Sequence, residues 1–169
     1  TIKLIDRLNI DYFTFNQIFK NTMHDEYSKI RSANKLIANW KINDASFMLA
    51  SIDKESIESL YHLEMYNVAE SYILENTKKI DEMTFVSRIE SAIDFPNILQ
   101  HKIINATELN TLIRLNSIYS GRRDSRIVDF FIQCLESDNL SAYGLLPEMA
   151  PVMYASVVKG LYKLKEYQR

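Results

Sequence analysis

The sequence is poor in the residues that break helices and in the residue that forms disulfides. Its 169 residues include three glycines, three prolines and one cysteine. A β-sandwich or β-barrel needs many turns, and turns are rich in glycine and proline. The composition therefore argues against an all-β fold and favours long helices. The single Cys134 cannot form an internal disulfide, which favours a reducing intracellular compartment, with the cytoplasm as the first expectation.

Long apolar stretches are also absent. The longest, Pro151 to Val158, is closed by Lys159 and is far shorter than the ~20 residues of a membrane-spanning helix. The N-terminal residues carry scattered charges and lack the apolar stretch of a secretory signal. We therefore expect no membrane span and no leader in the sequence as it stands, although a removed leader would leave no trace.

Charge of one sign is not in excess. The net charge is −2 at pH 7, so the chain has no overall attraction for nucleic acids or anionic membranes. Apolar residues make up 47% of the chain, which is too hydrophobic for an intrinsically disordered protein. A chain of 169 residues is long enough for one domain with its own core. We expect residues 1–169 to form a single all-helical domain.

What the sequence does contain is helical periodicity, which is strongest between Thr107 and Leu135. The pattern predicts two helices joined by a tight turn at residues 120–123, with Thr107 as the N-cap of the first. Gly121 stands where a helix would end in a left-handed residue, and Asp124 follows as a cap for the second helix. The stripe of the second helix includes Cys134, so we expect that thiol to be buried.

Similar patterns predict helices on both sides of this hairpin. One begins at Asp25 and places Trp40 in the core as an anchor, and a short apolar piece capped by Asp44 follows. A long helix then starts with an acidic first turn at Asp53, and Asp81 caps the next one. The apolar stripe of the long helix is expected to contain Ile57, Leu60, Tyr61, Met65, Val68, Ala69, Tyr72 and Ile73.

Residues 137–146 suggest a loop after the hairpin, and Pro147 or Pro151 suits the first turn of a last helix. Gly160 within that helix predicts a close helix crossing. The total is about eight to ten helical segments. They fit either a multi-helix bundle or a short solenoid of helical hairpins, and no fixed-period repeat decides between the two.

The motifs of catalysis and cofactor binding are missing. There is no nucleophile elbow, and three scattered glycines cannot build a phosphate-binding loop. The three histidines, His24, His62 and His101, lie on different predicted segments. Glu55, Glu58 and His62 could share one helical face, but a solvated charged face explains them more simply than a metal site. The glycosylation triplets at Asn105 and Asn139 are treated as coincidence. We expect no enzyme, no cofactor and no metal.

Two features point to macromolecular partners. Arg122, Arg123 and Arg126 gather at the turn of the central hairpin, where guanidinium groups suit phosphates or an acidic protein surface. The simplest interpretation pairs Arg126 with Asp124 or Asp129 and leaves the other two solvated. In addition, tyrosines and methionines exceed what one apolar stripe per helix needs, and such side chains are favoured in interfaces.

These features predict a non-enzymatic helical adaptor, assembly factor or small structural subunit that binds other proteins in a larger complex, with homo-oligomerisation left open. The alternative is an RNA- or DNA-binding helical protein that uses a basic patch around the arginine turn. The candidate partner-binding residues are Arg122, Arg123, Arg126, Tyr154, Lys159, Tyr162 and Lys163.

Overall fold

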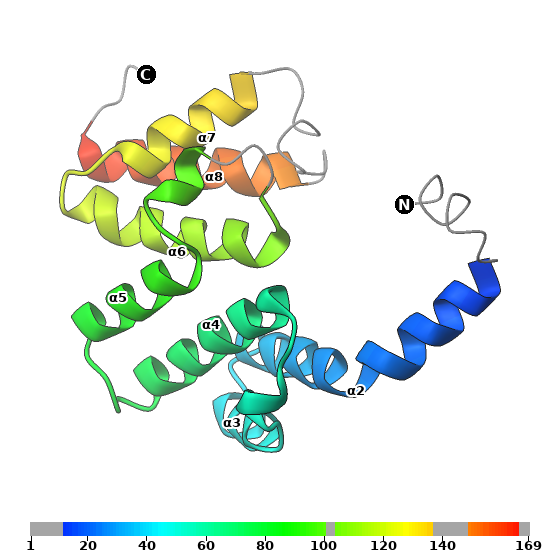
Figure 1. Cartoon of the computed structure of the whole chain (residues 1–169). Helices are drawn as coiled ribbons and strands as arrows, with labels where there is room; N and C mark the ends of the chain where they lie inside the picture. The colour runs from blue at the N-terminus through cyan, green and yellow to red at the C-terminus, as the bar shows by residue number, and fades with distance from the viewer. Residues whose placement is uncertain (1–11, 101–103, 137–148, 166–169) are drawn as a thin grey trace. The chain divides into compact units, whose positions relative to one another are not determined.

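The protein is helical wherever the structure describes regular elements (Figure 1). The computed structural model describes residues 12–100, 104–136 and 149–165, with side chains from residue 25 onward. Within these ranges it contains seven α-helices, two short 3-10 helices and no strand, which confirms the all-α prediction. The elements are α2 (Tyr12–Ala38), α3 (Ile42–Ala50), η1 (Lys54–Ser56), α4 (Leu60–Asn76), α5 (Glu82–Ala92), η2 (Asn97–Gln100), α6 (Ala106–Gly121), α7 (Arg126–Glu136) and α8 (Ala150–Leu164).

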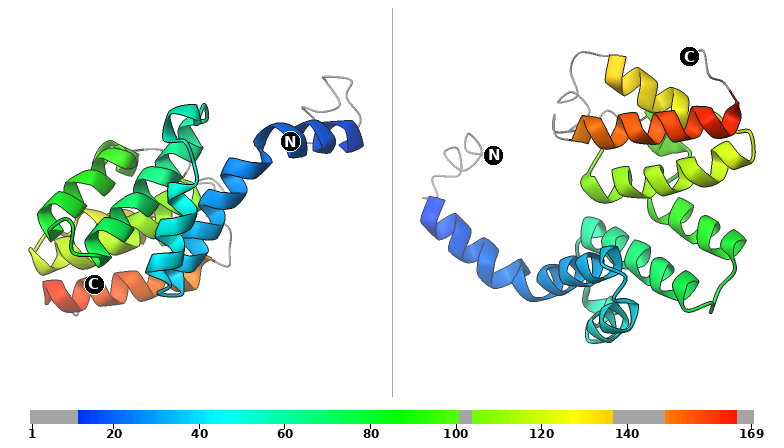
Figure 2. Two further views of the ribbon diagram at one scale, coloured as in Figure 1. Left: turned by 90° about the horizontal axis from the view of Figure 1, so that it is seen from below. Right: turned by 180° about the vertical axis from the view of Figure 1, so that it is seen from behind.

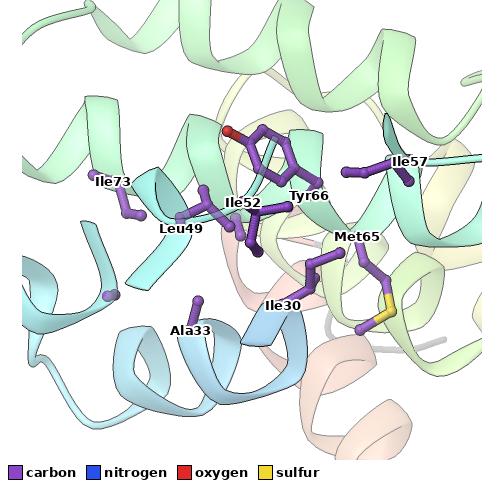
Figure 3. Packing of buried hydrophobic residues seen from close by; sticks show 10 residues of the cluster. Ile30, Ala33, Leu49, Ile52, Ile57, Met65, Tyr66 and Ile73 are labelled. Carbon is purple, nitrogen blue, oxygen red and sulfur yellow. The ribbon is translucent and has the colours of Figure 1, made fainter. Parts of the chain in front are cut away.

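The chain divides into two compact units, Thr1–Lys79 and Ile80–Arg169, and each is described by itself. The expectation of one domain over residues 1–169 stays a prediction. Within the first unit, α2, α3 and α4 pack against one another. Figure 3 shows their apolar side chains converging between the helices. The buried cluster consists of Ile30, Ala33, Ala45, Leu49, Ile52, Ile57, Met65, Tyr66, Ala69 and Ile73.

The start predicted at Asp25 is wrong, because α2 runs without a break from Tyr12 to Ala38. Asp25 is part of this helix, and its carboxylate forms an ion pair at 2.5 Å with the ammonium group of Lys29, one turn further along. An aspartate that pairs at this spacing resembles an N-cap in the sequence, because both kinds of aspartate precede an apolar stripe.

Trp40 is not a core anchor: it is 79% exposed. α2 ends at Ala38, and Trp40 takes a left-handed conformation with φ of 59°. The Lys41 N–H returns to the carbonyl of Leu36, which closes the helix end in a Schellman-type arrangement. The periodic pattern extends past this end, but the change in backbone direction carries the indole away from the helical stripe.

The long helix also begins later than predicted. Asp53 caps the short η1, and Ser59 caps α4 by accepting a hydrogen bond from the His62 N–H. Glu55 and Glu58 therefore precede α4, and they do not share a helical face with His62. Leu60, the first residue of α4, is 84% exposed and does not belong to the core stripe. Met65, Val68, Ala69 and Ile73 are buried on α4, as predicted. Ile57 is buried but precedes the helix as the C-cap of η1, and Tyr61 is 37% exposed.

The prediction that Asp44 caps the next helix is also wrong. α3 begins at Ile42, so Asp44 lies in its first turn instead of capping it.

In the second unit, α6, α7 and α8 pack against one another. α7 returns antiparallel to α6, whereas α8 runs in the same direction as α6, as Figures 1 and 2 both show. The predicted central hairpin is thus present, and a third helix lies against both of its arms. The buried apolar residues of this unit are Phe85, Val86, Ile89, Ile93, Ile98, Ile104, Leu109, Leu112, Leu115, Ile127, Val128, Phe130, Phe131, Cys134, Met153 and Val157.

The caps of this unit partly follow the prediction. Asp81 caps α5 through the Thr84 N–H, and Asp124 accepts the N–H of Arg126 at the start of α7, both as predicted. α6 is capped by Asn105 and not by Thr107, and Glu108 completes a capping box by accepting the Asn105 N–H. The sequence contains both Asn105 and Thr107, and only the box with Glu108 distinguishes them.

Gly121 does not supply the left-handed residue at the end of α6. It is the last helical residue, and Arg123 takes the left-handed conformation with φ of 63°. The Asp124 N–H then bonds to the Tyr119 carbonyl and the Arg123 N–H to the Ser120 carbonyl, which is the Schellman pattern. Each described left-handed residue that follows a helix is a non-glycine residue: Trp40, Lys78, Asp94, Arg123 and Lys165.

Pro151 lies in the first turn of α8, as predicted. Pro147, His24, His101, Asn139 and the loop predicted at 137–146 lie outside the residues whose side chains or positions the structure describes.

Candidate protein-interaction surface

The position of α8 is fixed by a close crossing at Gly160, as the sequence predicted. A Cβ atom at Gly160 would lie 2.5 Å from Val128 Cγ2 and 3.1 Å from both Asn116 Nδ2 and Ser120 Oγ. Asn116 is buried and donates from Nδ2 to the carbonyl and to the hydroxyl of Ser156, each at 2.9 Å. The inner face of α8 is therefore fully committed to α6 and α7.

The outer face of α8 carries apolar side chains that are largely exposed. Val158 is 65% exposed and Tyr162 is 69% exposed. Tyr154, Val152, Pro151 and Ala155 are also exposed. We call Pro151, Tyr154, Ala155, Val158 and Tyr162 the α8 outer face. Two of these residues, Tyr154 and Tyr162, were candidate partner-binding residues in the sequence.

The lysines of α8 differ in their surroundings. The Lys163 ammonium group donates to the carbonyl and hydroxyl of Ser117 on α6, at 2.7 and 2.8 Å, so it serves the α6–α8 contact. Lys159 is exposed beside the α8 outer face, and Lys165 follows the helix end. The segment from Ala150 to Lys165 contains no acidic residue. This surface is therefore apolar and basic.

The arginine turn is largely occupied by its own carboxylates. Arg126 binds Asp124 in a close, multiply hydrogen-bonded pair, with the shortest contact at 2.7 Å, as the simplest interpretation of the sequence expected. Hydrogen bonds from the Arg126 side chain hold the pKa of Asp124 below its usual value. Arg122 pairs with Glu82 at 3.2 Å. Arg123 makes no ion pair with any residue that the structure describes.

The Arg126 guanidinium also lies over two aromatic rings, Phe95 at 5.4 Å and Tyr119 at 5.6 Å from their centroids. Tyr119 donates a hydrogen bond to Glu90. Burial, helped by Glu90, raises the pKa of Tyr119 to about 12. These contacts tie the end of α5 to the turn between α6 and α7, so Arg126 has a structural role.

The parallel packing of α6 and α8 brings the arginine turn and the basic end of α8 to the same end of the second unit. Asn116 lies beside Ser156, and Ser117 beside Lys163. The structure thus brings Lys163 near the turn, and Tyr154 belongs to the earlier turns of α8. The candidate partner-binding residues therefore form two groups, the arginines of the turn and the residues of α8. Most of the arginines are paired with carboxylates.

Cys134 is buried, as predicted. Burial raises the pKa of its thiol to about 11, so the reactive thiolate is disfavoured. Among the described residues, no three His, Cys, Asp or Glu side chains lie close enough to hold a metal ion. Asn105 of the first glycosylation triplet is occupied by its capping box.

Sequence reasoning missed several exposed apolar side chains. Val158 was missed because only tyrosines and lysines of this helix were named as candidate partner-binding residues. Trp40, Phe47 and Leu60 in the first unit are also more than three-quarters exposed. For Val158 the signal was present in the sequence, because residues 151, 155, 158 and 162 recur at helical spacing opposite Met153 and Val157.

None of the described helices is long and apolar enough to cross a membrane. Comparison of the chain with protein-family models, with curated proteins and with solved structures found no match.

Proposed function

We propose that this protein is a non-enzymatic helical adaptor or small subunit that binds another protein through the α8 outer face. The observation that carries the proposal is the contrast between the two sides of α8. Its inner side is packed so tightly that Gly160 has no room for a methyl group, and its outer side leaves valine and tyrosine in water. Exposed apolar and aromatic side chains gathered on one rigid element are typical of protein interfaces.

A protein partner is favoured over nucleic acid by the state of the arginine turn. Phosphate binding would require guanidinium groups that are available to an anion. Arg122 and Arg126 already pair with Glu82 and Asp124, which lowers the positive potential of the turn. The buried, unreactive thiol of Cys134 also supports a reducing, intracellular setting for the function.

The proposal is tested by photo-cross-linking. A photoreactive amino acid replaces Val158 in one variant and the exposed Gln133 of α7 in a matched control. In extract from the native source, the variant at 158 should give a discrete cross-linked protein, and excess unlabelled wild-type protein should suppress it. Unlabelled Val158→Asp protein should not compete, because a buried carboxylate in an apolar contact is costly. Absence of a saturable product at 158, or equal competition by Val158→Asp, would overturn the proposal.

A further inference from the structure

The α8 outer face has the spacing of a helix–helix seam. Its residues 151, 155, 158 and 162 follow one another at intervals of four, three and four. This alternation is that of the a and d positions of a heptad, which place knobs into the holes of a second helix. Tyr154 and Lys159 then flank the seam, in the positions that contact the charged edges of a partner helix.

The charges beside the seam predict the charges at the edges of the partner helix. Lys159 flanks the seam and Lys165 follows its end; both are exposed, and no acidic residue accompanies them between Ala150 and Lys165. Lys163 is engaged with Ser117 and contributes less. Resting on the proposed function, we infer that the α8 outer face binds one amphipathic helix of a partner protein, whose apolar stripe is flanked by glutamate or aspartate.

A second copy of this chain is a poorer occupant. Two copies in contact through this face would bring together the exposed Lys159 and Lys165 of each, and neither copy has a carboxylate between Ala150 and Lys165. Like charges across a helix pair destabilise it, and opposite charges select the partner. A partner helix with acidic flanks supplies the negative charges that the segment from Ala150 to Lys165 lacks.

The experiment uses two synthetic peptide probes of about three heptads, with leucine and isoleucine in the seam. One probe has glutamate and the other lysine at the flanking positions. Binding of each labelled probe to the full chain is measured by fluorescence anisotropy. We expect the glutamate probe to bind at least about tenfold more tightly than the lysine probe at ~0.1 M salt, and the difference to shrink as salt rises.

Three variants make the result specific. Lys159→Glu/Lys165→Glu should reverse the preference between the probes, and Val158→Asp should abolish binding of both. Lys35→Glu, at an exposed position on α2, is the matched control and should change nothing. Circular dichroism checks that each variant keeps its helices.

Other outcomes separate this inference from the function on which it rests. Equal binding of both probes, or no binding, overturns the acidic-helix partner even where the cross-link at position 158 forms. Concentration-dependent dimerisation in sedimentation, lost in Val158→Asp, identifies a second copy as the occupant and also overturns the inference. Loss of the cross-link at 158 overturns the proposed function itself.

Discussion

The side-chain amide of Asn116 on α6 donates to both the carbonyl and the hydroxyl oxygen of Ser156 on α8, each at 2.9 Å, and both residues are buried. Ser120 completes the network by donating to Asn116 Oδ1 at 3.0 Å. Because an amide satisfies its partners in only a few geometries, this contact fixes the register of α8 along α6. The register in turn sets which residues of α8 face outward.

Replacing Asn116 by alanine should lower the free energy of unfolding by about 2 kcal/mol, because Ser120 and Ser156 lose their buried partner. Urea denaturation followed by circular dichroism measures the change. Asn76→Ala is the matched control, because its amide donates to the Tyr72 carbonyl in an exposed turn of α4. That variant should stay within about 0.5 kcal/mol of wild type. Equal effects of the two substitutions would contradict the role given to Asn116.

The two described helical glycines should respond in opposite ways to alanine. Gly160→Ala should destabilise by about 1–3 kcal/mol, because the new methyl group would overlap the fully buried Val128. Gly121→Ala should stabilise by about 0.5–1 kcal/mol, because no atom lies within 4 Å of its added Cβ. The double variant Gly160→Ala/Val128→Ala should lose less stability than the sum of the single variants. Additive losses in thermal or urea unfolding would argue against a direct clash.

Arg123→Gly should stabilise the protein by about 1 kcal/mol, because Arg123 occupies a left-handed conformation that glycine adopts without a Cβ penalty. Arg123→Ala removes the same charge and keeps the Cβ, so it should bring no comparable gain. Thermal unfolding at matched salt compares the two. A similar gain in both variants would assign the effect to charge and not to backbone conformation.

The Cys134 thiol should react only when the fold opens. At pH 8 an aromatic disulfide reagent should label native protein slowly and urea-unfolded protein at once, because burial keeps the thiol protonated and covered. Its folded pKa of about 11 lies above the 9.0 of an unperturbed cysteine thiol. The raised pKa of Cys134 therefore stabilises the folded state fully below pH 9, and this stabilisation is lost as pH rises towards 11. Unfolding free energies should fall more steeply over that range in wild type than in Cys134→Ala.

The arginine turn should be a poor phosphate site. Binding of a labelled single-stranded RNA should be no tighter than the ~0.1 mM of weak non-specific contact at physiological salt. Arg122→Ala/Arg123→Ala should leave it nearly unchanged, because Arg122 is already paired with Glu82 and Arg123 is then a single exposed cation. Fluorescence anisotropy across a salt series measures this. Tight binding that weakens steeply with salt and is lost in the double variant would favour the nucleic-acid alternative.

Local rules were sufficient where a signal acts within one turn. The Asp81 cap, the first-turn Pro151 and the burial of Cys134 all follow from neighbours in the sequence. The local rules failed at helix ends, because Trp40 and Arg123 take left-handed conformations in which glycine is the usual residue. At the site, Tyr154 and Tyr162 could be named as surface candidates, but the engagement of Lys163 with Ser117 joins residues that are 46 positions apart.

By itself the sequence determined that the chain is helical, since scarce glycine and proline and the apolar periodicity act through the backbone of each segment. Only the tertiary structure decided which side of α8 is outside. Val157 and Val158 have the same tendency to leave water, and the contacts of Gly160 with Val128 of α7 and of Ser156 with Asn116 of α6 decide that Val157 is buried and Val158 exposed.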